Sequence, residues 1–294
     1  MTMSEMKWQH GSTWYRVVGD LTGPKTPVMV LHGGPGAGHN YCESIADLMT
    51  LSGRAAVLYD QIGCGNSTHL PDAPKDFWTP ELFMEELKNL TEHLGIASKY
   101  NIIGQSWGGM LGMQYATHKP KGLNALVVAD SPASMEVWVS EANKLRKELP
   151  AEVEATLLKH EAAGTTEDPE YVAAVNVFYA RHLCRIPQPA SVVASFEQMA
   201  KDPTVYHTMN GPSEFHVIGS LKEWDIRPDL KNISVPTLLV SGQYDEATPA
   251  MVKEIHGLIP GSKWELFAES SHMPHVEEPA KFLRVVSNFL DSHD

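Results

Sequence analysis

The residues best suited to chemistry begin with a serine set between glycines, in GQSWGG at residues 104–109. The serine follows KYNIIGQS, an apolar run that predicts a strand, and precedes WGGMLGMQYATHKP, which predicts a helix. A serine hydroxyl is a weak nucleophile until a base takes its proton, and a tight strand-to-helix turn exposes it. Glycines at 104 and 108 avoid side-chain collisions across such a turn. The pattern predicts Ser106 as the nucleophile of an acyl-transfer reaction.

An acid and a histidine are expected beyond later strands, in that chain order. Asp245 follows the strand-like run VPTLLVSG, and His272 follows the strand-like run KWELFAES. Asp245 comes 139 residues after Ser106, and His272 comes 27 residues after Asp245, so only the first interval has room for a large insertion. We predict a catalytic triad of Ser106, Asp245 and His272.

Other residues compete for these roles. Asp130, in VVADSP, also ends a predicted strand and could supply the acid, as it does in some hydrolases of this kind. Glu246 adjoins Asp245, but a shift of one residue points its side chain elsewhere. His275 lies closer to the start of the last helical segment, which favours a packing role.

Two backbone N–H groups should face the negative charge that develops on the substrate oxygen. One is predicted at Trp107, directly after the nucleophile. The other is predicted in LHGGPG, where Pro35 has no N–H and the glycines at 33, 34 and 36 remain; we choose Gly34. The same loop could cradle a phosphate, but it lacks the lysine of a P-loop and fits G-x-G-x-x-G badly.

Short apolar runs alternate with helical stretches along most of the chain, which predicts a mostly parallel sheet wrapped by helices. The predicted strands are TWYRVVG, TPVMVLHG, RAAVLYDQ, KYNIIGQS, NALVVADS, VPTLLVSG and KWELFAES. TPELFMEELKNLTEHLG predicts a helix with Thr79 as its N-cap, and EPAKFLRVVSNFL predicts the last helix. These elements would carry the reactive residues on the loops at one edge of the sheet.

The alternation stops between residues 135 and 223. Four helix-like stretches follow one another there: EVWVSEANKLRKEL, PAEVEATLLKHEAAG, DPEYVAAVNVFYARHLC and PASVVASFEQMAKD. Pro150, Pro169 and Pro189 stand at the starts of three of them, a common first-turn placement. We predict a helical cap over residues 135–223, inserted into a core formed by residues 1–134 and 224–294.

Composition limits the partners. The formal net charge of −13 disfavours binding to nucleic acid and to anionic membrane surfaces. No apolar run approaches the roughly 20 residues that span a bilayer, and the first residues lack the apolar segment of a secretory signal. Cys42, Cys64 and Cys184 have no metal-ligand spacing, so we expect free thiols and a cytoplasmic protein.

Six motifs occur together and in order: HGGPG, YDQIGCGNS, GQSWGGM, MNGPSEF, SGQYDEATP and SHMPHVEEP. Over nearly the whole chain they resemble the proline iminopeptidase family of α/β-hydrolase peptidases. The match is closest to the type that includes the tricorn-interacting aminopeptidase and the L-amino acid amidases. The resemblance implies the α/β-hydrolase fold, with an eight-stranded sheet and a helical cap. It also implies that no metal or organic cofactor is used.

The resemblance further implies an activity, the release of an N-terminal amino acid from short peptides or amino acid amides through an acyl-enzyme. It assigns the nucleophile, acid, base and oxyanion donors to the positions already predicted, namely Ser106, Asp245, His272, Gly34 and Trp107. Family members hold the free amine of the substrate with two glutamates, which fall here on Glu214 and Glu246. An ammonium group that leaves water needs anionic partners, so such a pair would select unblocked N-termini.

Two departures from the family pattern bear on specificity. Ile62 stands where many bacterial members have arginine in the sequence Asp-Gln-Arg-Gly, and Trp107 and Gly109 replace a second serine in the nucleophile turn. The aminopeptidase or amidase class is therefore better supported than a strict preference for proline, and other small or apolar first residues are expected. Asp60, in the same motif as Ile62, is expected to hold a turn. The alternatives are a carboxylesterase of the same fold and a ligand-binding homologue without turnover.

Overall fold

The structure, a computed structural model, describes residues 2–294, which are built around one eight-stranded sheet. Its strands are β1 (Thr2–Trp8), β2 (Gly11–Val18), β3 (Val28–Leu31), β4 (Ala56–Tyr59), β5 (Tyr100–Gln105), β6 (Leu123–Ala129), β7 (Thr237–Gly242) and β8 (Lys263–Phe267). The spatial order is β1-β2-β4-β3-β5-β6-β7-β8. From β4 to β8 every neighbouring pair is parallel, whereas β2 is antiparallel to both β1 and β4. The predicted fold class, an α/β fold with a mostly parallel sheet, is confirmed.

Helices cover both faces of this sheet. They are α1 (Glu43–Leu51), α2 (Pro80–His93), α3 (Trp107–Thr117), α9 (Pro249–Leu258), α10 (Pro274–Glu277) and α11 (Pro279–Asp291). Alternate residues of a strand point to opposite faces, and β3 shows the consequence. Met29 and Leu31 pack in the core that contains α2, α3 and α9, while Val28 and Val30 pack in the core that contains α1 and α11. Short 3₁₀ helices lie at Asn40–Cys42, Lys75–Phe77, Ser220–Glu223 and Arg227–Asn232.

The first strand was not predicted. β1 pairs only with β2, so it forms one edge of the sheet, and its sequence TMSEMKW places charged Glu5 and Lys7 on an exposed side. Charged residues on an edge strand discourage pairing with another chain, and they also weaken the apolar pattern by which a strand is recognised. The helix predicted from Thr79 is confirmed as α2, because the Thr79 hydroxyl caps it by accepting the Leu82 N–H at 3.4 Å.

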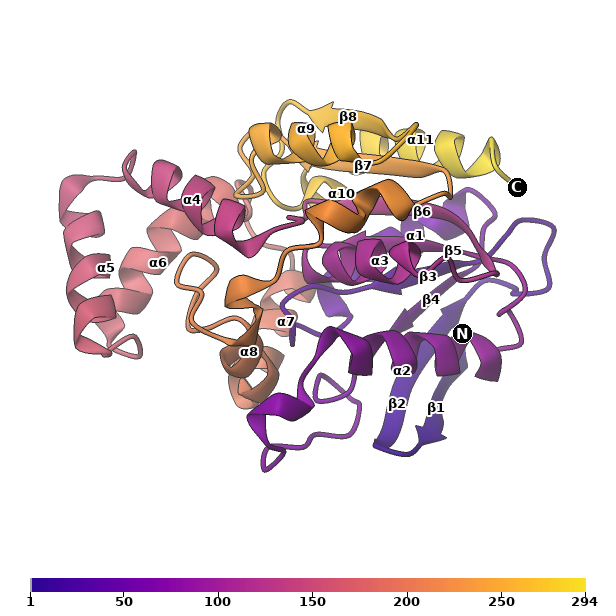
Figure 1. Ribbon diagram of the computed structural model, residues 1–294, viewed down its shortest axis with the longest axis horizontal. Helices are drawn as coiled ribbons and strands as arrows, with labels where there is room; N and C mark the ends of the chain where they lie inside the picture. The colour runs from indigo at the N-terminus through magenta and orange to yellow at the C-terminus, as the bar shows by residue number, and fades with distance from the viewer. Residues whose placement is uncertain (1) are drawn as a thin grey trace.

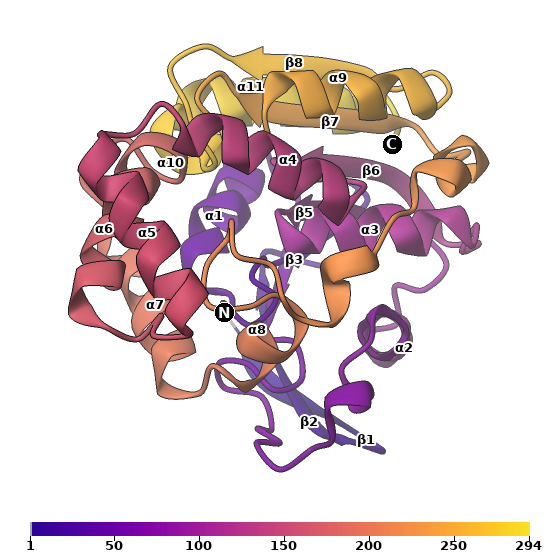
Figure 2. The ribbon, with the colours of Figure 1, turned by 60° about the vertical axis from the view of Figure 1, so that its left-hand side comes forward.

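Five helices lie in the chain between β6 and β7: α4 (Met135–Arg146), α5 (Ala151–Ala163), α6 (Pro169–His182), α7 (Ala190–Lys201) and α8 (Thr204–Met209). The first four follow the predicted stretches, and the short α8 was not predicted. Figure 1 shows α4, α5 and α6 on the side of the molecule opposite the C-terminus, and Figure 2 brings this helical segment to the front. Leu157, Phe178 and Phe215 give it a small apolar core of its own. Its division from the rest as a cap stays a prediction.

The two connections of this helical segment run side by side. Ser134 and Asp225 form an antiparallel bridge. Beside it, the Met135 N–H donates to the carbonyl of Trp224 at 3.0 Å, and the Ile226 N–H donates to the carbonyl of Ala133 at 2.9 Å. The chain therefore leaves the sheet and returns to it through one narrow, hydrogen-bonded junction. Within residues 2–294, no helix is both long and apolar enough to cross a bilayer.

Candidate functional site

Ser106 occupies a strained turn between β5 and α3. β5 ends at Gln105 and α3 begins at Trp107, so Ser106 alone makes the turn, with φ of 55° and ψ of −123°. Positive φ is costly for a residue with a side chain and is tolerated where packing holds it. The turn is possible because of its glycines: a Cβ at Gly104 would lie 2.1 Å from the carbonyl oxygen of Gly108, and one at Gly108 would lie 2.0 Å from that of Leu31.

The loop after β6 forms a hydrogen bond to the same turn. The hydroxyl of Ser131 donates to the carbonyl oxygen of Ser106 at 2.8 Å. A Cβ at Gly109 would lie only 2.0 Å from that hydroxyl oxygen, so Gly109 keeps the space open. The sequence did not single out Ser131, whose only signal was its place directly after a strand end.

His272 and Asp245 meet in the protein interior. The Nδ1 atom of His272 donates to Oδ1 of Asp245 at 2.7 Å, and the backbone N–H of Ala247 donates to the same oxygen at 2.8 Å. Both side chains are buried. Burial opposes the charged imidazolium, but the Asp245 carboxylate outweighs it, so the pKa of His272 lies above its usual value. This pairing fixes the Nε2 atom as the free end of the ring, which can serve as a base.

The imidazole and the serine share one cavity. Ser106, His272, Gly34 and Glu214 all contribute to its lining. Among the hydrogen bonds of the described residues, none joins the Ser106 hydroxyl to His272. A nucleophile and its base often come within hydrogen-bond distance only in the complex with substrate. The structure therefore brings the two side chains to the same cavity without a hydrogen bond between them.

Two of the three rival residues, Asp130 and His275, have no hydrogen bond to the His272 ring among the described residues. The Nδ1 atom of that ring is taken by Asp245. His275 is fully buried, with Nε2 3.3 Å from the carbonyl oxygen of Tyr41 and its ring against Tyr41 and Phe282. Burial lowers the pKa of His275 to about 3. Its surroundings are those of a neutral, packed histidine.

The glycine loop after β3 lies opposite the start of α3. The N–H of Gly33 is already engaged, since it donates to the Tyr41 hydroxyl at 2.6 Å. Gly34 has φ of 106° and lines a second cavity together with Ser106 and Trp107. The first N–H groups of a helix have no acceptor within it, and their positive potential favours negative charge. Gly34 and Trp107 therefore line the same cavity as Ser106, and their role as an oxyanion hole stays a prediction.

A chain of hydrogen bonds joins the glycine loop to the histidine loop. The Tyr41 hydroxyl, which accepts from Gly33, donates to Oε1 of Gln105 at 2.5 Å. The Nε2 atom of Gln105 then donates to the backbone carbonyl of His272 at 2.8 Å. Gln105 is the unspecified residue of the Gly-x-Ser-x-Gly pattern, and nothing in the sequence singled it out. Its side chain connects three loops of the site.

Glu277, at the end of α10, forms hydrogen bonds to the residues on both sides of His272. Its carboxylate accepts the N–H and the hydroxyl of Ser271 at 2.8 and 2.9 Å, and the N–H of Met273 at 3.3 Å. It also accepts the Arg185 N–H at 2.8 Å, from the helical segment between β6 and β7. The residues on both sides of His272 are thus held by one carboxylate.

Glu214 lines the cavity that contains Ser106, and Glu246 is a buried neighbour of the His272 ring. Glu214 accepts the Tyr206 hydroxyl at 2.7 Å and is partly exposed to the cavity. Glu246 is buried, neither of its carboxyl oxygens has a hydrogen-bond donor among the described residues, and Oε1 lies 3.8 Å from Nε2 of His272. Burial raises the pKa of both glutamates, and the charges of Glu214 and Asp245 raise that of Glu246 further. A positive group beside Glu214 and Glu246 would stabilise their charged forms.

Asp60 holds a turn, as expected. Oδ1 accepts from the backbone and ring nitrogens of His39 at 2.7 and 2.8 Å, and Oδ2 accepts from the backbone and side chain of Asn66 at 2.8 and 2.9 Å. Ile62, which stands in place of the family arginine, is buried and donates its N–H to the carboxylate of Glu86 at 2.9 Å.

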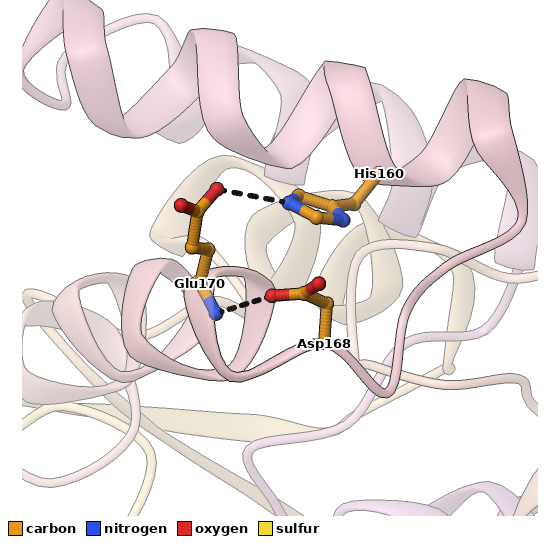
Figure 3. A group of neighbouring side chains, drawn as sticks. All are labelled: His160, Asp168 and Glu170. Carbon is orange, nitrogen blue, oxygen red and sulfur yellow. Dashed lines mark hydrogen bonds and ion pairs between the residues drawn. The ribbon is translucent and has the colours of Figure 1, made fainter.

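One further cluster has the residue types of a metal site. Ligand atoms of His160, Asp168 and Glu170 lie within 4.8 Å of one another, where α5 meets α6 (Figure 3). Each already has a partner: Asp168 caps α6 by accepting the Glu170 N–H, Glu170 pairs with Lys159, and His160 bonds Thr165 through Nδ1. These contacts tie the two helices together, and the sequence predicted no metal ligand here.

Comparison with known proteins agrees with the fold. Residues 26–279 match the family model described as alpha/beta hydrolase fold, so the chain belongs to that fold family and is a hydrolase. A proline iminopeptidase of Clostridium botulinum is 37% identical, over 100% of this chain and 99% of its own length. The chain belongs to the proline iminopeptidase family within that fold.

Solved structures agree with that membership. The crystal structure of proline iminopeptidase from Mycobacterium smegmatis is 46% identical, with a TM-score of 0.92 over 99% of this chain and 98% of that one. The crystal structure of VinJ is 50% identical, with a TM-score of 0.97 over 100% of this chain and 99% of that one. The family resemblance seen in the sequence motifs is confirmed.

Proposed function

We propose that this protein is a serine aminopeptidase that removes the N-terminal amino acid from short peptides or amino acid amides. The observation that carries the proposal is that one cavity contains Ser106, His272 and Glu214, with Asp245 and Glu246 buried directly behind. Ser106 supplies the nucleophile, His272 the base and Asp245 the acid that orients it. The two glutamates supply negative charge for the substrate amine. Relatives named proline iminopeptidase support the same activity.

The reaction begins with the substrate amine. Its ammonium group lies between Glu214 and Glu246 and exchanges water for two carboxylates, which a blocked amine cannot do. A fixed distance between these carboxylates and Ser106 then measures one residue from the N-terminus. The first side chain extends toward apolar residues beside Ser106, among them Pro35 and Met110. Such surroundings favour apolar first residues.

Acyl transfer follows. Nε2 of His272 takes the proton of Ser106 as Oγ bonds to the substrate carbonyl carbon, and the oxyanion accepts the N–H groups of Gly34 and Trp107. The C–N bond breaks, and His272 gives its proton to the leaving amine. His272 then takes a proton from a water molecule as it attacks the ester, and returns this proton to Oγ of Ser106 as the amino acid leaves. Asp245 stays charged throughout and holds the ring in place.

Matched substrates test this proposal. We expect an amino acid p-nitroanilide with a free amine to be cleaved with a kcat/KM about 10- to 150-fold above that of its N-acetylated form, since a hydrogen bond to a charged group contributes on the order of 1.5–3 kcal/mol. Glu246→Gln should lower the rate on the free-amine substrate only. The matched control is Glu92→Gln, at an exposed glutamate on α2. Equal rates on blocked and free substrates would instead support a carboxylesterase.

The nucleophile has its own test. Ser106→Ala should lose several orders of magnitude in kcat and all covalent labelling by a fluorophosphonate probe, while it keeps the native melting temperature. Near-normal turnover in this variant would reject the assignment of Ser106. A wild-type protein that is neither labelled nor active would support the ligand-binding alternative.

The proposed partners follow from the same chemistry. The substrate is a small peptide or amide, and a net charge of −13 gives no support to nucleic acid or an anionic membrane as a partner. We propose the cytoplasm as the compartment, where the buried, unpaired thiols of Cys42, Cys64 and Cys184 stay reduced.

A further inference from the structure

The end of β6 lies next to the end of β7, which leads to the proposed catalytic acid. Ala129 pairs with Val240, and the N–H of the next residue, Asp130, donates to the carbonyl of Val240 at 2.9 Å. Asp130 has φ of 56°, a left-handed conformation that is uncommon for a residue with a side chain. Its neighbour Ser131 supports the carbonyl of Ser106. Two consecutive residues at this strand end thus face the proposed triad.

The hydrogen bonds around these carboxyl groups are incomplete. Asp130 is fully buried, and neither of its oxygens has a donor among the described residues. Oδ2 of Asp245 is also buried without a donor, whereas Oδ1 of Asp245 accepts from His272 and Ala247. Each buried oxygen without a donor would lower the stability of the folded protein by about 1–3 kcal/mol. Three such oxygens in one place indicate a shared hydrogen atom.

The two carboxyl groups follow adjacent strand ends and are close enough for the charge of Asp245 to act on Asp130. Two charged carboxylates this close inside a protein repel, so one of them holds a proton. Asp245 has two N–H donors that stabilise its charge, whereas the Gly242 N–H has the smallest effect on Asp130 and is outweighed, so the proton belongs to Asp130. Burial raises the pKa of Asp130 well above its usual value, and the charges of Asp245 and then Glu277 act in the same direction.

We infer that Asp130 is a neutral carboxylic acid whose O–H donates to Oδ2 of Asp245, which makes it a positioning residue for the pair of Asp245 and His272. The inference rests on the proposed triad. In it Asp130 supports Asp245 and does not replace it as the acid. Its hydrogen bond gives Asp245 a donor on each oxygen. The carboxylate then cannot rotate away from Nδ1 of His272, and Asp130 itself keeps its proton through the reaction.

Two substitutions of similar shape separate this role from simple packing. Asp130→Asn places an amide N–H where the acid O–H was, so we expect kcat/KM within about threefold of wild type and an unchanged pH profile. Asp130→Leu removes the donor, so we expect kcat to fall about 10- to 100-fold, the usual cost of losing a support of this kind, with KM little changed. The acid limb of its pH profile should move to higher pH, because an unsatisfied Asp245 attracts the imidazolium more strongly.

Infrared spectroscopy tests the proton itself without any substrate. At neutral pH, the difference spectrum of wild type minus Asp130→Asn should contain the C=O stretch of a protonated carboxylic acid. No such band would overturn the inference, as would equal losses of activity in folded Asp130→Asn and Asp130→Leu. If Asp130→Leu does not fold, the infrared difference spectrum with Asp130→Asn still tests whether Asp130 holds a proton. A failure of the proposed function would show instead as turnover by Ser106→Ala, which leaves the spectrum unaffected.

Discussion

Gln105 and His272 are joined by a hydrogen bond of 2.8 Å from the side-chain amide of Gln105 to the backbone carbonyl of His272. Gln105 directly precedes Ser106, so the residue before the proposed nucleophile holds the loop of the proposed base. The bond spans 167 positions in the sequence. This amide side chain therefore links the placement of the serine to that of the imidazole.

Gln105→Met should therefore reduce turnover without removing any reacting group. The methionine fills the space but makes no hydrogen bond to His272 or Tyr41, so we expect kcat to fall about 10- to 100-fold with a smaller change in KM. Steady-state kinetics and the melting temperature measure the two effects. Gln9→Met, which removes only the exposed hydrogen bond of Gln9 to Glu85, is the matched control. Equal kcat values in the two variants would contradict this role of Gln105.

Tyr206→Phe should weaken the proposed amine site. The hydroxyl that this substitution removes is the donor to Glu214 at 2.7 Å, and without it the charged form of Glu214 is less stable. We expect KM for a free-amine substrate to rise about tenfold, while kcat stays near wild type. A p-nitrophenyl ester without an amine should be hydrolysed as before. An equal loss on both substrates would indicate damage to the cavity instead.

The pH dependence follows from the two kinds of group in the site. His272 must be neutral to act as base, and its pKa is raised by Asp245 against the effect of burial, so kcat/KM should fall as pH drops below a value above 6.5. The raised pKa values of Glu214 and Glu246 add a rise in KM at low pH. With the p-nitrophenyl ester, which has no amine, the only loss of kcat/KM at low pH should be the one caused by protonation of His272. If the midpoint of this loss for the ester lay below pH 6.5, the result would be inconsistent with the Asp245–His272 pair.

The sequence predicted the parts of the site that obey local rules. The glycine spacing around Ser106 and the strand ends before Asp245 and His272 are short-range patterns, and the structure has them where they were expected. Gln105, Ser131 and Glu277 were not predicted, because their roles depend on which loops meet in space. β1 and α8 were missed for a different reason: one is a charged edge strand and the other has only six residues.

The nucleophile turn makes a prediction about stability. Gly108→Ala would place a Cβ 2.0 Å from the carbonyl oxygen of Leu31, so the backbone must move and we expect loss of soluble protein or a large drop in melting temperature. Gly257→Ala, in α9, is the matched control, because no atom lies within 4 Å of the added Cβ. This variant should gain about 0.5–1 kcal/mol in the free energy of unfolding. Two variants of equal stability would contradict the steric argument.

Glu86 gives the stability its own pH dependence. Burial raises the pKa of Glu86 to about 8, although the Thr13 hydroxyl and the Ile62 N–H both donate to it. Between pH 4.5 and about 8 the folded protein binds a proton here that the unfolded chain has released, so the free energy of unfolding falls as pH rises. Glu86→Gln should remove this decline. Urea unfolding of both proteins at about pH 5.5 and about pH 8 measures it; parallel declines would exclude Glu86 as the cause.

The narrow junction at Ser134 and Asp225 has a consequence for how this enzyme could change. Because the chain departs and comes back at one point, we propose that residues 135–223, the predicted cap, can be replaced as one cassette without a change in the strands of the sheet. Glu214 travels with that cassette, whereas Glu246 stays with the sheet. Grafting the matching piece of a relative should therefore alter which substrates are accepted, while the reactive serine keeps its setting.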